Sequence, residues 1–328
     1  MSKHIVTYLA ASALVLGAGA PATAQEATVY KPAGQWALDY GDDYCRLMRT
    51  FSDGQNELSL AFERIQPGPM MRMILVGDGI RTYRSASELG WNFAPAAGEE
   101  RKARYAQSET ADGKGYFNLG SVSVMPMPGF GPASAQVRRD FSRVPSPAPE
   151  SSGSEGPRVP PAYDRQAEQA AAKPLNAIQL GSGLLRPVRI ETGSLEAPVG
   201  ALQACADDLV KTWGVDPAKL ADKGVPAIPE GGGVGWLPQG TIPFDQFGKL
   251  AGESNQVRLL VDAGGKPTSC HIHWPTLGDS LNKRICSTLM DKAKFVPAKD
   301  SEGNAMPGYW IGSPMFLGPP MPGGRRPG

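Results

Sequence analysis

The sequence predicts an α+β protein, in which a β-rich amino-terminal domain with one packed helix precedes a small unit of two strands, a helix and a third strand. Three patterns predict it: apolar residues at every second position from Gln35 to Val76, apolar residues at three- and four-residue steps after Ser194, and the order strand, strand, helix, strand near the carboxyl end. The expected boundaries are 25–214 for the β-rich domain, 215–239 for a linker, 240–317 for the carboxy-terminal unit and 318–328 for a flexible tail.

The first 24 residues have the features of a cleavable signal peptide. Lys3 is followed by an apolar run to Ala20, and Ala22-x-Ala24 fits a signal-peptidase site, which would make Gln25 the first mature residue. An uncleaved anchor is the alternative, but spanning a bilayer takes roughly 20 apolar residues, more than this run offers. We therefore expect an exported, periplasmic protein without a stable membrane anchor.

The composition argues against a nucleic-acid partner. Lys and Arg number 33 and Asp and Glu number 32, so the net charge of +1 provides no general attraction to phosphates. A hydrophobic content of 41% is enough for a core, whereas 40 Gly and 31 Pro indicate long loops.

The first strands are predicted from alternation and from turn residues. Cys45 lies in an expected strand from Tyr44 to Phe51, and turns are expected at Asp53-Gly54 and at Pro67-Gly68-Pro69. The alternating apolar residues of the neighbouring strands are Trp36, Leu38, Tyr40, Leu58, Leu60, Phe62, Met71, Met73 and Leu75.

Residues 126–161 are rich in Pro, Ser and Gly and predict an extended loop. This loop could be a linker between domains or an insertion within one. We favour the insertion, because a helical stretch at 163–173 and strands at 175–180 and 187–191 continue the same pattern.

A strong helix signal follows these strands. Ser194 is expected to cap the helix and Gly214 to end it, with Cys205 on the face that points to the core. The glycines at 231–233 and 235 fall in the expected linker, and they lack the strand, helix and Lys of a phosphate-binding loop.

The carboxy-terminal unit begins with strands expected at 257–262 and 268–274, joined by a Gly-Gly turn. Asp279 is expected to cap a helix that runs to about Ala293, and Tyr309 to Phe316 predicts the third strand.

This unit resembles the TonB carboxy-terminal domain over residues of about 240–317, in its Val-Asp-x-x-Gly hairpin and its Phe-x-Pro-Ala segment after the helix. Asn255 stands where that family usually has Gly. The resemblance implies a sheet edge that pairs with a short extended peptide of an outer-membrane transporter. The residues that carry the resemblance, all expected to act structurally, are Val261, Asp262, Gly265, Phe295, Pro297, Ala298 and Gly303.

The four cysteines, Cys45, Cys205, Cys270 and Cys286, allow three pairings in an oxidising compartment. Cys270 shares a strand face with Ile272, and the helix that carries Cys286 must cover that face. A Cys270–Cys286 disulfide is therefore preferred over a metal site that combines these thiols with the neighbouring histidines. Cys45 with Cys205 is the companion pairing, with the other two pairings still open.

The opposite strand face carries His271 and His273, a weak candidate metal site. Two imidazoles leave a metal under-coordinated, so solvent-facing side chains are the preferred interpretation. Asp42-Asp43 and Asp207-Asp208 are interpreted as solvated charges.

No nucleophile with a nearby base can be recognised, so neither an enzyme nor a cofactor is expected. Three functions remain: a non-catalytic envelope protein that binds a protein partner, a structural envelope protein, and an unrecognised enzyme or metal carrier.

Overall fold

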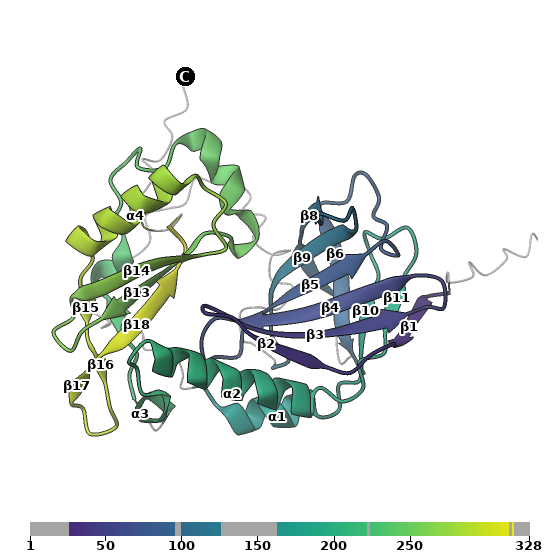
Figure 1. The fold of residues 1–328 in the computed structure, drawn as a ribbon, viewed down its shortest axis with the longest axis horizontal. Coiled ribbons are helices and arrows are strands. Elements are labelled where there is room, and N and C mark those ends of the chain that lie inside the picture. The colour runs from purple at the N-terminus through teal and green to yellow at the C-terminus, as the bar shows by residue number, and fades with distance from the viewer. Residues whose placement is uncertain (1–25, 96–99, 126–162, 222–223, 315–316, 318–328) are drawn as a thin grey trace, which may run out of the picture.

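The computed structural model describes residues 26–95, 100–125, 163–221, 224–314 and 317. The chain is a mixed α+β protein with one large sheet, smaller sheets and few helices (Figure 1). The expected signal peptide (1–24), the Pro/Ser/Gly-rich loop (126–161) and the tail (318–328) lie outside the described residues. In the part that is described, no helix is long and apolar enough to cross a membrane.

The large sheet is built from the amino-terminal part of the chain and contains eleven strands among the described residues. In sheet order the strands are β7 (Arg101–Arg104), β6 (Glu88–Ala94), β10 (Ala177–Leu180), β11 (Val188–Ile190), β1 (Thr28–Pro32), β3 (Cys45–Ser52), β4 (Glu57–Arg64), β5 (Met71–Gly77), β9 (Gly115–Val122) and β8 (Ala106–Glu109), with β2 (Ala37–Tyr40) paired to β3. The alternation predicted β2 to β5, the antiparallel meander with the most regular pattern. Strands β1 and β6 to β9 were not predicted.

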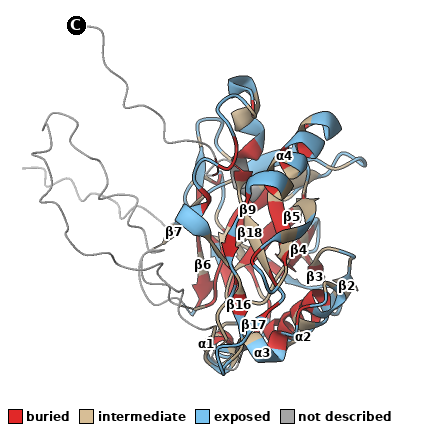
Figure 2. Ribbon diagram, turned by 90° about the vertical axis from the view of Figure 1, so that its left-hand side faces the viewer, coloured by how far each residue is buried: buried red, intermediate tan, exposed pale blue. Residues whose placement is uncertain are grey.

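This sheet folds over its own core. Phe62 of β4 and Phe93 of β6 lie several strands apart in the sheet order, yet their ring centroids are 6.4 Å apart. β1 joins the two halves, since it pairs in parallel with β11 and antiparallel with β3. The apolar faces of both halves therefore bury one another, and the strands at the centre of the molecule are largely buried (Figure 2).

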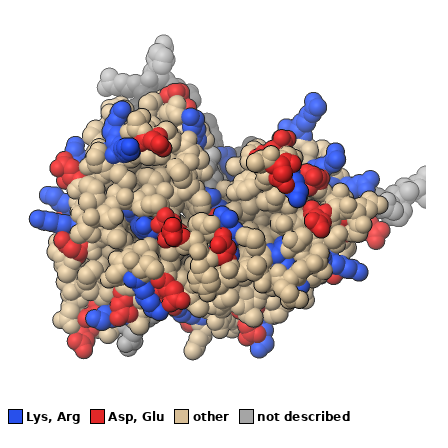
Figure 3. All heavy atoms as spheres, viewed as in Figure 1, with Lys and Arg blue, Asp and Glu red and all other residues tan. Residues whose placement is uncertain are grey.

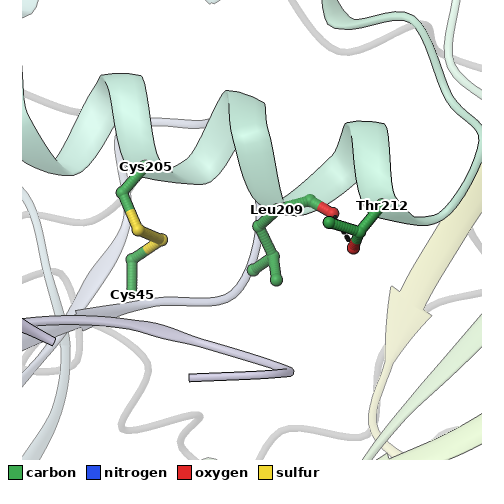
Figure 4. Close-up of a disulfide and its surroundings, with 4 residues drawn as sticks. All are labelled: Cys45, Cys205, Leu209 and Thr212. Atoms are coloured by element: carbon green, nitrogen blue, oxygen red, sulfur yellow. Dashed lines mark hydrogen bonds between the residues drawn. A yellow bond between two sulfur atoms is a disulfide. The ribbon is translucent and has the colours of Figure 1, made fainter. Parts of the chain in front are cut away.

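Helices α1 (Arg165–Ala172) and α2 (Glu196–Thr212) lie together beside this sheet (Figure 1). α2 packs on β3, and the disulfide between Cys45 of β3 and Cys205 of α2 spans a Cα–Cα distance of 5.9 Å (Figure 4). The expected cap is displaced by one residue, because Leu195 occupies the N-cap position. Ser194 Oγ nevertheless accepts the Glu196 N–H at 3.3 Å.

The carboxy-terminal part has a three-stranded antiparallel sheet in the order β14 (Pro267–His273), β13 (Gln256–Val261) and β18 (Gly308–Gly312). α4 (Asp279–Lys292) covers one face, where the Cys270–Cys286 disulfide joins β14 to the helix at a Cα–Cα distance of 5.5 Å. Gly278 is the N-cap and Asp279 the first helical residue, so the expected cap at Asp279 is wrong by one position. The remaining elements are α3 (Pro217–Ala221), β12 (Ile228–Pro229), the 3-10 helices η2 (Glu230–Gly233) and η3 (Phe244–Glu253), β15 (Phe295–Val296), β16 (Ala298–Lys299) and β17 (Ala305–Met306).

Buried apolar residues form two clusters, one under the large sheet and one under α4. Ala227, Trp236 and Leu237, which the sequence placed in a linker, belong to the second cluster. Trp236 packs edge-on against Phe295 at 5.1 Å. Below, the amino-terminal part means residues 26–214 and the carboxy-terminal part residues 224–317.

Candidate functional site

The face of the β14–β13–β18 sheet opposite α4 is covered by the amino-terminal part. His271 and His273 point to this face, as strand alternation predicts, but the expected exposure to solvent is wrong: His273 is only 3% exposed. The reason is tertiary, since the turn between β2 and β3 and the side chain of Arg72 reach this face.

Asp43, in that turn, is the centre of a polar group that we call the junction cluster: Asp43, Arg258, His271 and His273. Arg258 Nη1 donates to Asp43 Oδ1 at 2.8 Å, and His271 Nε2 lies 2.9 Å from Asp43 Oδ2. Both carboxylate oxygens thus have a partner from the carboxy-terminal sheet. The expectation that Asp43 is a solvated charge is wrong, whereas its neighbour Asp42 is exposed.

Burial is the main influence on the pKa of both histidines and lowers it. Burial, followed by the positive charge of Arg258, lowers the pKa of His273 to about 3. Burial also lowers the pKa of His271, against the opposing effect of the Asp43 carboxylate. Arg258 supplies the positive charge that compensates the Asp43 carboxylate.

Two arginines, Arg258 of the junction cluster and Arg72 beside it, each lie over one aromatic ring. The guanidinium carbon of Arg258 lies 4.1 Å from the ring centroid of Trp213, at the end of α2. The guanidinium of Arg72, on β5, lies 3.5 Å from the ring centroid of Trp274, directly after β14. Tyr309 of β18 packs edge-on against Trp213 at 5.3 Å. These contacts therefore link side chains of the two parts across the junction.

A second buried polar group lies within the amino-terminal part. The side chains of Arg64 and Glu168 are both fully buried and form an ion pair between β4 and α1. Gln203 Nε2 of α2 donates to Glu168 Oε2 at 2.8 Å, and the Tyr163 hydroxyl contacts the same carboxylate. Nothing in the spacing of these residues predicted the group.

Asp207 is also not a freely solvated charge. Arg165 of α1 contacts both of its carboxylate oxygens, which joins α1 to α2. Asp208, by contrast, is exposed and pairs with Lys211 at 2.9 Å.

Residues of the hairpin and Phe-x-Pro-Ala motifs connect the turn between β13 and β14 to the segment that follows α4. Gly265 has a φ of 84°, and a Cβ atom there would lie 2.1 Å from the Phe295 carbonyl oxygen. The Phe295 N–H donates to the Gly265 carbonyl at 3.0 Å. Asp262 Oδ1 accepts the N–H groups of Gly264 and Lys266, which closes the turn. The remaining motif residues are Val261, Phe295 and Ala298, which are buried, Pro297 between β15 and β16, and Gly303, whose φ is 86°.

The two edge strands of the β14–β13–β18 sheet form a further candidate binding surface. Within the described residues, β13 pairs on both sides, whereas β14 and β18 each pair only with β13. Every second residue of such an edge strand points its N–H and C=O away from the sheet.

The visible surface carries no large area of one charge. Basic and acidic side chains alternate over both parts of the molecule in the view of Figure 3. Compared with known proteins, the chain matches no family model, no curated protein and no solved structure. Function is therefore inferred from the chemistry of these residues.

Proposed function

We propose that this chain is an exported, non-catalytic envelope protein. Its carboxy-terminal part, which resembles the TonB carboxy-terminal domain, binds an extended segment of a partner protein along the outer edge of β18. The resemblance implies that the partner is an outer-membrane transporter.

The observation that carries the proposal is the pairing of β18. Among the described strands, only β13 pairs with it. Its sequence, Gly-Tyr-Trp-Ile-Gly, contains neither a charge nor Pro, the devices that usually protect a sheet edge from added strands. β14, at the other edge, begins with Pro267, which has no N–H to donate.

The faces of the sheet support binding through the main chain rather than through side chains. α4 and the Cys270–Cys286 disulfide cover one face, and the junction cluster docks the other on the amino-terminal part. A partner strand would then gain its affinity from backbone hydrogen bonds. Pro307 and Pro314 flank β18 and limit such a strand to about five residues.

The motif residues support the family resemblance in physical terms. Gly265 is needed because the Phe295 carbonyl leaves no room for a side chain. Asn255, at the position where the family usually has Gly, has a φ of 57°, and Asn tolerates this left-handed conformation better than most residues.

Export is supported by the leader-like first 24 residues and by the two disulfides. Disulfides persist in oxidising compartments such as the periplasm.

Site-specific crosslinking in cells tests the proposal. A photoreactive residue replaces Ile311 on the β18 edge, and the matched control replaces Thr268 on the β14 edge. The expected result is a crosslink from position 311 alone to one short segment of an envelope protein. A synthetic peptide of that segment should then slow amide hydrogen exchange at 309–312 in the purified chain.

Crosslinks of equal yield from both positions, or a peptide that leaves exchange at 309–312 unchanged, would contradict strand pairing at β18. The carboxy-terminal part would then have the purely structural role that the sequence left as an alternative.

A further inference from the structure

We propose that Asp43, His271 and His273 bind one divalent ion of the zinc class at the junction between the amino- and carboxy-terminal parts. One carboxylate oxygen of Asp43 and one ring nitrogen of each histidine all lie within 4.8 Å of one another. Two imidazoles alone would leave the ion under-coordinated, and the third ligand comes from a residue more than 220 positions earlier in the chain.

His273 provides the second observation that points to a ligand. Its side chain is almost fully buried, and its Nε2 atom has no hydrogen-bond partner among the residues that the structure describes. A buried polar atom without a partner is uncommon and costs about 1–3 kcal/mol. A metal ion bound at this nitrogen would supply the partner that the described residues do not.

The spacing between the first two ligands fits a shared ion. His271 Nε2 and Asp43 Oδ2 are 2.9 Å apart. Zinc binds imidazole nitrogen and carboxylate oxygen at about 2.0–2.2 Å, so two neighbouring ligands of one ion lie roughly 3 Å apart.

Arg258 orients the carboxylate for this role. Its guanidinium donates to Asp43 Oδ1 at 2.8 Å, which leaves Oδ2 as the atom turned toward His271. Hydrogen bonds to the second oxygen of a ligating carboxylate are a common feature of metal sites.

The site is open on one side. The side chains of His271 and Asp43 are 36% and 29% exposed, so an ion can enter from solvent and keep water in the remaining coordination positions. Because the three ligands come from the β2–β3 turn and from β14, the ion joins the two parts of the molecule.

Zinc binding to the full chain, purified without an affinity tag and stripped with chelator, tests the proposal. Equilibrium dialysis with Zn²⁺ should give about one ion per chain, and Co²⁺ should give visible absorption bands typical of nitrogen and oxygen ligands. Asp43→Asn and His273→Phe should each weaken Zn²⁺ binding by at least about tenfold. Asp42→Asn, which changes an exposed neighbour of the same charge, is the matched control and should bind like the unchanged chain.

Thermal unfolding gives a second, independent measurement of the same binding. Zn²⁺ should raise the Tm of the unchanged chain and of Asp42→Asn, because a ligand that binds only the folded state stabilises it. Asp43→Asn should remain folded in the absence of metal and show no Zn²⁺-dependent rise.

Two results would overturn the site: no stoichiometric Zn²⁺ binding by the unchanged chain, or equal binding by Asp42→Asn and Asp43→Asn. In either case the junction cluster is a hydrogen-bonded contact only.

Discussion

Asp43 and Arg258 lie 215 positions apart in the sequence, yet a hydrogen bond of 2.8 Å joins their side chains across the junction of the two parts. Arg258 is 8% exposed and also packs on Trp213, so its charge has little access to water. Asp43 is therefore the group that compensates a largely buried guanidinium.

A double-mutant cycle should measure this coupling. Asp43→Ala leaves the Arg258 charge uncompensated, and Arg258→Ala leaves a carboxylate without its charged partner. We expect the two changes to be non-additive by about 1–3 kcal/mol in the free energy of unfolding, obtained from urea titration. Asp42→Ala paired with Arg258→Ala is the control and should be additive. Additivity in both cycles would mean that the contact contributes nothing to docking.

Removing the Cys45–Cys205 disulfide should destabilise the amino-terminal part strongly. The bond closes a loop with a sequence separation of 160, and on the chain-entropy model such a loop contributes about 5 kcal/mol. The double variant Cys45→Ala, Cys205→Ala should show a correspondingly lower midpoint in guanidinium unfolding. A change of less than about 1 kcal/mol would show that the unfolded chain is not restricted as the chain-entropy model assumes.

The Cys270–Cys286 disulfide closes a much shorter loop, with a sequence separation of 16, so we expect about 3 kcal/mol from Cys270→Ala, Cys286→Ala. The effect should be local to β14 and α4. Hydrogen exchange should accelerate in residues 267–292 and remain slow in β3 to β5. Uniform acceleration over the whole chain would contradict a local role.

Gly265→Ala and Gly303→Ala should separate the cost of a steric clash from the cost of a left-handed backbone conformation. Both have a φ near 85°, at 84° and 86°, but only at Gly265 would a Cβ meet backbone, 2.1 Å from the Phe295 carbonyl oxygen. Gly303→Ala should lower the free energy of unfolding by about 1–2 kcal/mol through the left-handed conformation alone. Gly265→Ala should lower it clearly further, because the hairpin and the segment after α4 must separate. Equal effects in chemical denaturation would show that the contact with Phe295 relaxes freely.

The buried ion pair of Arg64 and Glu168 should be sensitive to the loss of one partner. Both side chains are fully buried, so Glu168→Gln leaves the guanidinium without a counter-charge. A loss of about 3–5 kcal/mol is expected in urea unfolding. The control is Lys211→Gln, which removes an exposed pair with Asp208 and should change stability by less than about 1 kcal/mol. Similar losses in both variants would contradict this ranking.

The strands and helices that were predicted from regular apolar periodicity agree with the structure, although the expected caps at Ser194 and Asp279 are each displaced by one residue. Alternation located β3, β4 and β5, because each strand has one face against the core, and the three- and four-residue steps located α2. Strand alternation also placed Cys270 opposite His271, and the disulfide to Cys286 follows from that face. Strands β6 to β9 carried no clear period, since β6 is buried over most of its length and β8 is exposed throughout.

The sequence by itself determined strands β2 to β5, the strands of the carboxy-terminal sheet, helices α2 and α4, the side of β14 on which each residue lies, and the Cys270–Cys286 disulfide, because these depend on residues close together in the chain. The Cys45–Cys205 pairing joins residues 160 positions apart, and the sequence left the other two pairings open. The tertiary structure alone decided what covers the outer face of β14. Whether His273 meets water or Asp43 depends on how two separate cores dock, and that docking rests on contacts such as Asp43 with Arg258 between residues 215 positions apart. A periodic pattern shows which face of a strand is apolar. His271 and His273 are polar side chains that the amino-terminal part of the same chain covers, so no local periodicity predicts their burial.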